Sequence, residues 1–283
     1  MTDAAGTNAR RLPAGACDCH FHVFDAARYA YGAGRHYTPP DATLADYLAL
    51  CDRFGIDRSV LVHPTVFGAD HASFEDILRL QVGRMRGVAV VSPDTPDADI
   101  ARWHAIGARG TRITTIFGGG SDIDTITKIV CKVRPFGWHV QVLVDLFENP
   151  DFIAQVHAVG VEVVADHLGH HAPAELLPSA GFANLLSLLK DGVAWVKLSA
   201  PYRLAAQGHV DTGVQAVVEA LVKANPAQLV WGTDWPHPNS PHPVPTDAQL
   251  VAQVFDWLPD EVLRRAVLVD NPGRLYWNDA AQA

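Results

Sequence analysis

The segment ACDCHFHVFD at residues 16–25 places two cysteines, two histidines and two aspartates within ten positions. In this order the residues could form a zinc cluster of thiolates and imidazoles. In a β-strand, however, successive side chains point to opposite faces. We therefore predict that Asp18, His20 and His22 share one face, where they can take part in chemistry. The two cysteines should lie on the other face and pack against helices.

Similar apolar runs recur along the chain, and segments with helical signals separate them. The eight runs span residues 16–23, 58–64, 87–93, 109–115, 139–145, 161–169, 193–199 and 228–236. Strands that alternate with helices predict crossover connections and a parallel sheet. Eight such units within 283 residues predict a (β/α)8 TIM barrel. A doubly wound sheet is disfavoured, because no Gly-rich nucleotide-binding fingerprint follows an early strand.

Two of the predicted helices carry clear end signals. The segment TLADYLALCDRFG begins with a capping Thr43 and ends at Gly55. The segment SFEDILRLQVG is predicted to begin at Ser73 and end at Gly83. We expect residues 1–14 to form a flexible lead, and residues 15–283 to form a single domain.

The composition limits the classes of function. Hydrophobic residues make up 48% of the chain and charged residues 19%, which predicts a large core. The formal net charge of −9 argues against a nucleic-acid partner but not against an anionic substrate. No run of about 18 apolar residues predicts a membrane span. The four cysteines show neither zinc-binding nor disulfide spacing, so we expect buried free thiols in a cytoplasmic protein.

Polar residues fall where the predicted strands end, which is where the active sites of such barrels lie. These residues are His20, His22, His63, Arg112, His167, Tyr202, Arg203 and Asp234. Three histidines and one aspartate can hold a tetrahedral zinc ion. Without metal, the same groups can polarise a carbonyl through the imidazoles while Asp234 activates water.

The arginines are candidate anchors for an anionic substrate. Arg112 shares its strand face with Gly110, which leaves room for a bulky cation, so we predict that Arg112 rather than Arg109 points inward. A guanidinium there would offer two parallel hydrogen bonds to a carboxylate. Arg203 follows the seventh strand and is a second candidate anchor. His63, Tyr202, His237 and His242 are further candidates by position alone.

Three motifs resemble the amidohydrolase superfamily: DCHFHVFD at 18–25, DHLG at 166–169 and GTDWPHP at 232–238. The resemblance extends from about residue 15 to 277, including the NPGRLY ending at 271–276. It is to the branch of 2-pyrone-4,6-dicarboxylate lactonase-like hydrolases and sugar-acid lactonases.

The resemblance implies a distorted (β/α)8 barrel with His20, His22, His167 and Asp234 at its catalytic mouth. In related lactonases the aspartate is the general base for water attack, and the histidines polarise the lactone carbonyl. The arginines of these enzymes hold substrate carboxylates, a role that the resemblance carries to Arg112 and Arg203 here.

The sequence departs from the superfamily in two places. The fifth strand, HVQVLVD, offers Gln141 and no lysine, so we do not expect a two-metal centre. Enzymes of the lactonase branch are commonly metal-independent, so the resemblance implies that no cofactor is required, with one zinc ion on His20, His22, His167 and Asp234 as the alternative. Glycines occupy TTIFGGGSD at 114–122, where dicarboxylate lactonases have another arginine, which leaves room for a monocarboxylate sugar lactone.

The predicted function is hydrolysis of a carboxylate-bearing lactone, with a small-molecule acid as the partner and no membrane or nucleic acid involved. Isomerisation of a sugar-acid lactone on the same site is one alternative, and a zinc-dependent decarboxylase is another. A non-catalytic acid-binding barrel is a fourth hypothesis, which the complete histidine and aspartate set disfavours. The sequence is compatible with a homo-oligomer, and the resemblance suggests catabolism of aromatic or sugar acids.

Overall fold

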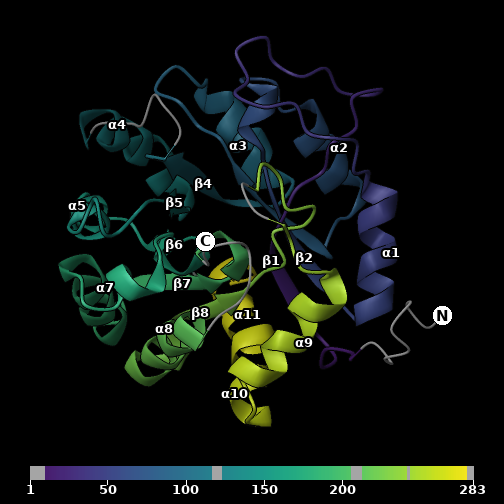
Figure 1. Ribbon diagram of the computed structural model, residues 1–283. Coiled ribbons are helices and arrows are strands. Elements are labelled where there is room, and N and C mark those ends of the chain that lie inside the picture. Colours follow the sequence, from purple (N-terminus) through teal and green to yellow (C-terminus); the bar gives the residue numbers. More distant parts are fainter. Residues whose placement is uncertain (1–9, 117–122, 205–211, 241–242, 279–283) are drawn as a thin grey trace.

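The computed structural model of the protein describes residues 10–116, 123–204, 212–240 and 243–278. Eight parallel strands form one sheet in the order β1 to β8, each paired with the next along the chain. A parallel bridge between Phe21 and Trp235 brings the end of β8 back to β1. The strands are β1 (Cys17–Phe21), β2 (Arg58–Val62), β3 (Met85–Ala89), β4 (Ala108–Thr114), β5 (His139–Leu143), β6 (Val163–Ala165), β7 (Ala194–Leu198) and β8 (Leu229–Trp231). The predicted TIM barrel is confirmed (Figure 1).

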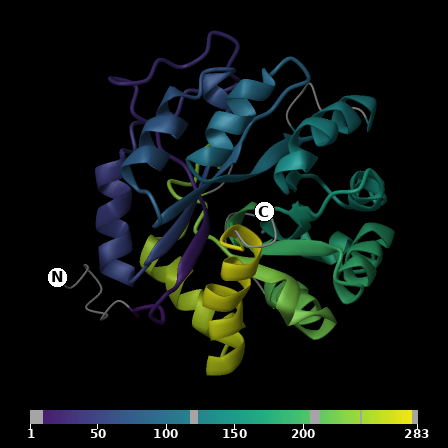
Figure 2. The same cartoon turned by 180° about the vertical axis from the view of Figure 1, so that it is seen from behind.

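Most of the α-helices surround the strands (Figure 1). They are α1 (Leu44–Phe54), α2 (Ala72–Leu80), α3 (Asp97–Ala105), α4 (Ile123–Val133), α5 (Phe152–Ala158), α6 (Pro173–Leu176), α7 (Ala180–Lys190), α8 (Thr212–Ala224), α9 (Asp247–Trp257), α10 (Glu261–Arg265) and α11 (Asn271–Tyr276). Seen from behind, α11 lies near the middle of the barrel (Figure 2). Among the described residues, no helix has the length and apolar character needed to span a bilayer.

Local capping explains both ends of α1 and the start of α2. Thr43 caps α1 in a capping box with Asp46, and Gly55 ends it with φ 78°, both as predicted. The predicted ends of α2 are wrong, because this helix has His71 rather than Ser73 at its N-cap and Gln81 rather than Gly83 at its C-cap. The start moves because a side-chain oxygen of Asp70 accepts the backbone N–H of Ala72.

The predicted faces of β1 are wrong for Asp18 and for the two cysteines. The pairing register with β2 shifts between Asp18 and Phe21, so β1 carries one extra residue there. Before the shift, Asp18 points toward α1, where its Oδ2 accepts the hydroxyl of Tyr47 at 2.9 Å. Cys17 and Cys19 lie inside the barrel, in a cluster with Val60 of β2 and residues of four other strands and α11.

Two other sequence expectations need correction. The end of the predicted flexible lead packs on the barrel, because Leu12 is buried and its N–H donates to the carbonyl of Phe54. Residues 1–9 of that lead lie outside the described residues. Three of the four cysteines are buried free thiols as predicted, but Cys131 is exposed. It lies on α4 away from the stripe that this helix buries, which includes Ile126, Ile129, Val130 and Val133.

Candidate active site

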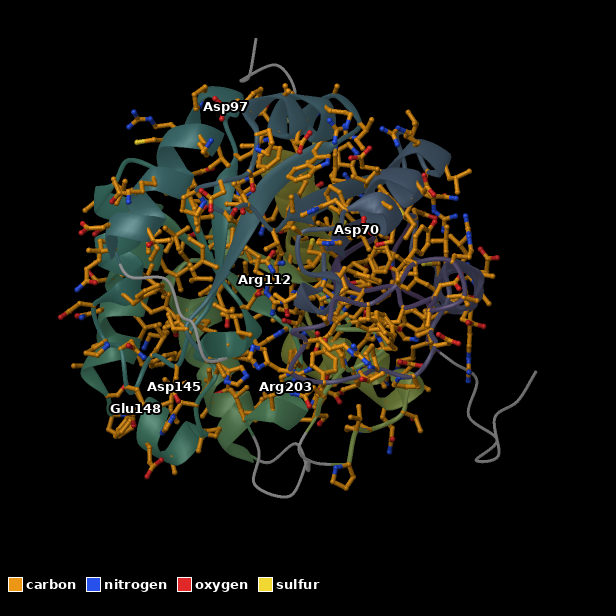
Figure 3. The ribbon with its side chains drawn as sticks, turned by 90° about the horizontal axis from the view of Figure 1, so that it is seen from above. Asp70, Asp97, Arg112, Asp145, Glu148 and Arg203 are labelled. Atoms are coloured by element: carbon orange, nitrogen blue, oxygen red, sulfur yellow. The ribbon has the colours of Figure 1, made fainter. Side chains whose placement is uncertain are left out.

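A pocket opens at the C-terminal ends of the strands and encloses about 510 Å³ of empty space, including the part open to solvent. Its lining includes His22, Tyr37, Arg112, His167, Arg203 and Asp234. Tyr37 comes from the segment between β1 and α1, and the other five come from or directly follow β1, β4, β6, β7 and β8. In Figure 3, Arg112 lies near the middle of the molecule and Arg203 lies below it, whereas Asp145 and Glu148 lie toward the lower left.

The backbone at the end of β8 is tied to β1. The N–H of Asp234 donates to the carbonyl of His20 at 2.8 Å, and the N–H and hydroxyl of Thr233 donate to the Asp18 carboxylate at 2.9 and 2.6 Å. Asp234 and His167 both have positive φ, at 59° and 52°. Such values are uncommon for residues other than glycine, and the candidate residue His237 has one too, at 63°.

The two oxygens of Asp234 have different surroundings. Oδ2 accepts the hydroxyl of Tyr202 at 2.7 Å and lies 2.9 and 2.8 Å from Nε and Nη2 of Arg203. Oδ1 faces the Nε2 atoms of His20, His22 and His167 at 3.6, 3.6 and 3.8 Å. One oxygen therefore fixes the carboxylate, and the other is left for chemistry.

Burial keeps the three imidazoles neutral. It lowers the pKa of His20 to about 3, and the nearby Lys197 ammonium acts in the same direction. Burial likewise lowers the pKa of His22 and of His167. A neutral imidazole carries one proton, so the partner of each Nδ1 decides whether its Nε2 donates or accepts.

The tautomer of His22 follows from its surroundings. Its Nδ1 lies 2.7 Å from the carbonyl oxygen of Val62, which can only accept a hydrogen bond. The proton is therefore on Nδ1, and Nε2 presents a lone pair, 3.3 Å from Nε2 of His20. Nδ1 of His167 lies 2.9 Å from the hydroxyl of Ser199, which can donate or accept. Nε2 of His22 carries no proton, and a proton on Nε2 of His20 would be needed to pair with His22. His167 is therefore the histidine of these three whose Nε2 can donate to a ligand in the pocket.

The carboxylate of Asp234 is held in its ionised form. Burial alone would raise its pKa, but the Arg203 guanidinium outweighs burial and holds this pKa well below its usual range. Burial would also raise the pKa of Tyr202, and here the Asp234 charge adds to that effect. Tyr202 therefore remains a hydroxyl donor to Asp234.

Sequence reasoning missed a buried charge network below the pocket. Lys197 of β7 is fully buried, and its Nζ lies 3.4 Å from Oδ1 of Asp166 and donates to Oε1 of Gln141. Nε2 of Gln141 donates to Oδ2 of Asp166 at 2.7 Å. A lysine in the middle of the apolar run VAWVKLS was the signal that could have revealed this network.

Arg112 points into the pocket, as predicted. Its Nε is 3.6 Å from Oδ2 of Asp166, and its side chain is 11% exposed. The predicted reason is wrong, because the space beside Gly110 is filled by another residue. A Cβ at position 110 would lie 2.5 Å from Nε2 of His139, so the glycine makes room for that ring and not for the guanidinium.

Several predicted substrate contacts lie outside the pocket lining. Tyr202 is fully buried behind Asp234, and its hydroxyl also lies 3.0 Å from Nδ1 of His237. His63 is buried and stacks on His71 with ring centroids 4.1 Å apart. His242 lies outside the described residues. The substrate-binding roles of these residues stay predictions.

Part of the predicted ligand set fits one zinc ion. One ligand atom from each of His20, His22 and Asp234 lies within 4.8 Å of the other two, whereas His167 falls in a different group with His20 and Asp166. Tetrahedral zinc with nitrogen and oxygen ligands at about 2.0–2.1 Å places those ligand atoms about 3.3 Å from one another. Nε2 of His20 lies 3.3 Å from Nε2 of His22, and each of these atoms lies 3.6 Å from Oδ1 of Asp234. The hydrogen bond from Nδ1 of His22 to a backbone carbonyl is typical of a metal-binding histidine.

Comparison with known proteins finds several similar relatives, including the following three. A 2-pyrone-4,6-dicarboxylate hydrolase of Comamonas testosteroni is 33% identical, covering 94% of this chain and 92% of its own. A 4-sulfomuconolactone hydrolase of Hydrogenophaga intermedia is 30% identical over 94% and 89% of the two chains. A D-galactarolactone isomerase of Agrobacterium fabrum is 27% identical over 94% and 92%.

A solved structure and a family match agree with these relatives. The crystal structure of a putative 2-pyrone-4,6-dicarboxylic acid hydrolase from Pseudomonas putida is 29% identical, with a TM-score of 0.80 over 94% of this chain and 98% of that one. The sequence matches the amidohydrolase family over residues 17–277, which include every described element of the barrel. This protein belongs to the amidohydrolase family, and the relatives that it resembles include lactone hydrolases and a lactone isomerase.

Proposed function

We propose that this protein hydrolyses the ring ester of a lactone that carries a carboxylate. The single observation that carries the proposal is the arrangement around Asp234. One of its oxygens is fixed by Arg203 and Tyr202, while the other faces three neutral imidazoles in a pocket that also holds Arg112. This arrangement supports water activation beside a bound anion, and two of the relatives bear the names of lactone hydrolases.

In the proposed reaction, Arg112 binds the substrate carboxylate and sets the lactone carbonyl above Oδ1 of Asp234. Asp234 accepts a proton from water as the water oxygen bonds to the carbonyl carbon. Nε2 of His167 donates to the developing oxyanion, with the hydroxyl of Ser199 holding its Nδ1. The ring C–O bond then breaks, and the leaving oxygen takes the proton held by Asp234. The product is an open-chain hydroxy acid or its tautomer.

We propose that this reaction requires no metal, since each step has a protein group to perform it. A zinc ion, if bound, would be held by His20, His22 and Asp234, and would polarise the carbonyl and acidify water. The buried free thiols support a cytoplasmic location, and we propose a small carboxylic acid lactone as the natural partner.

Isomerisation is the second candidate function, and the D-galactarolactone isomerase among the relatives favours it. There, a substrate hydroxyl would attack the carbonyl in place of water, with the same base and the same donors. Turnover in ¹⁸O-labelled water separates the two reactions. Hydrolysis places one labelled oxygen in the product, whereas isomerisation places none.

The proposal is tested first by metal content and turnover together. Freshly purified protein is analysed by inductively coupled plasma mass spectrometry and assayed on a panel of lactone acids before and after chelation. We expect substoichiometric metal and unchanged turnover after chelation. Stoichiometric zinc, with activity lost on its removal, would favour metal-assisted hydrolysis or a zinc-dependent decarboxylase. Asp234→Asn should abolish turnover, and a variant with unchanged turnover would disprove the assigned base.

A further inference from the structure

Lys197 carries a buried ammonium directly below the imidazoles. Its side chain is fully buried, and three acceptors from three different strands or strand ends surround Nζ. It donates to Oε1 of Gln141, and it lies 3.4 Å from Oδ1 of Asp166 and 3.4 Å from Nδ1 of His20. An ammonium has three N–H groups and no acceptor, so it can donate to Gln141 and to His20, while Oδ1 of Asp166 lies within ion-pair distance.

The contact between Nζ of Lys197 and Nδ1 of His20 sets the direction of a chain of hydrogen bonds. When Lys197 donates to Nδ1 of His20, the single proton of that neutral imidazole must be on Nε2. That Nε2 lies 3.3 Å from Nε2 of His22, which presents a lone pair because Nδ1 of His22 donates to Val62. The hydrogen bonds then run from β7 through β1 to β2, and each donor meets an acceptor.

The other tautomer of His20 would serve a different site. Oδ1 of Asp166 lies 3.4 Å from Nδ1 of His20 and has no hydrogen-bond partner among the described residues. A proton on Nδ1 could point to that oxygen. Nε2 of His20 would then present a lone pair toward the lone pair of His22 at 3.3 Å. Two such lone pairs repel each other unless a cation lies between them. A zinc ion bound through Nε2 needs this tautomer of His20, with the proton on Nδ1.

We propose that Lys197 is a positioning residue that holds the His20 proton on Nε2 and so keeps the imidazole cluster in its metal-free form. The proposal rests on the metal-free mechanism proposed above, and it names Lys197 as the side chain that disfavours metal binding. Zinc binding would require the His20 proton to move to Nδ1, against the Lys197 ammonium. It would also place a divalent cation one imidazole ring away from that buried charge, where screening by water is weak.

Zinc affinity tests the proposal without using activity. Competition titration with a chromogenic chelator would be run on protein carrying Cys131→Ser, because the exposed thiol of Cys131 is a separate zinc ligand. We expect Lys197→Met to bind zinc about 10–100-fold more tightly than the parent, the range by which partners of metal-binding histidines change affinity. Gln141→Met is the matched control, since it removes hydrogen bonds of the same network and keeps the ammonium. Its zinc affinity should stay within about threefold of the parent.

Nitrogen chemical shifts test the tautomer directly. In ¹⁵N-histidine-labelled protein, long-range ¹H–¹⁵N correlation should place the His20 proton on Nε2 in the parent and on Nδ1 in Lys197→Met. A proton on Nδ1 in the parent would overturn the proposal, and so would equal zinc affinities of the parent and Lys197→Met. If Lys197→Met does not fold, Lys197→Gln replaces it, and the parent spectrum alone still decides. Neither measurement uses a lactone, so a failed lactonase assay would leave this test independent.

Discussion

Arg203 and Asp234 form a buried ion pair in which two guanidinium nitrogens converge on one carboxylate oxygen. Nε and Nη2 of Arg203 lie 2.9 and 2.8 Å from Oδ2 of Asp234. The same guanidinium donates through Nη2 to the carbonyl of Pro238 at 2.7 Å, so both Nε and Nη2 are bound to protein oxygens. Sequence reasoning predicts that Arg203 holds a substrate carboxylate, but these contacts favour a role in orienting the proposed base.

Replacing Arg203 should therefore change the pH dependence of catalysis. The guanidinium offsets the effect of burial on Asp234, so Arg203→Met should raise the pKa of this carboxyl. The parent should keep its kcat/KM down to the lowest pH at which it stays folded. The variant should lose activity at a higher pH, because Asp234 then takes up a proton. The measurement is kcat/KM against pH, and Arg203→Lys, which keeps the charge, should show a smaller displacement. Identical profiles for all three proteins would contradict the orienting role.

Tyr202 gives a second test of the same arrangement. Its hydroxyl donates to Oδ2 of Asp234 at 2.7 Å from a fully buried position behind the pocket. Hydrogen bonds to charged groups contribute about 1.5–3 kcal/mol, so Tyr202→Phe should lower kcat about 10–100-fold. KM should change by less than about twofold, because the hydroxyl does not line the pocket. Steady-state kinetics on the preferred lactone would check this, and a raised KM with unchanged kcat would restore the predicted substrate contact.

Arg112 should determine the preference for anionic lactones. Its Nε has no hydrogen-bond partner among the described residues, and its guanidinium lines the pocket. Arg112→Met should reduce kcat/KM for a carboxylate-bearing lactone by about 2–4 kcal/mol, or roughly 30- to 1000-fold. An uncharged lactone of the same ring size is the control and should lose far less. Equal losses on both substrates would remove the anchoring role from Arg112.

The parts of the fold that depend on short sequence windows could be predicted. The eight strands follow from runs of apolar residues, and the ends of α1 follow from Thr43 and Gly55, whose capping chemistry acts within one turn. The strand ends also brought His22, His167 and Asp234 to one pocket, because parallel strands of a barrel share one catalytic end.

The parts that depend on distant partners could not be predicted. Asp18 does not lie on the predicted face, because its carboxylate accepts the hydroxyls of Thr233, 215 positions away, and of Tyr47 of α1. In the sequence, Lys197 is a single lysine within an apolar strand. Its partners Gln141 and Asp166 are known only from the structure. These contacts arise from the register of neighbouring strands, which alternation within a single strand does not specify.

Buried histidines should make the fold sensitive to acid, and His139 provides a test outside the proposed chemistry. Burial lowers the pKa of His139 to about 3, with the Lys197 charge acting in the same direction. In the unfolded chain its pKa is about 6.5, so below that pH the unfolded state binds more protons than the folded state. The free energy of unfolding should therefore fall as pH drops from about 6.5 toward 3.

His139→Leu should remove one group that takes up a proton when the protein unfolds below about pH 6.5. Each proton contributes about 1.4 kcal/mol per pH unit to the slope of stability against pH, so the variant's slope between pH 5.5 and 4 should be shallower by about that amount. Urea unfolding at several pH values measures the slope separately from any constant loss of packing around Gly110. The exposed His36, changed to leucine, is the control and should leave the slope unchanged. An unchanged slope in His139→Leu would mean that this imidazole is hydrated in the folded protein, and that the barrel interior around Lys197 admits water.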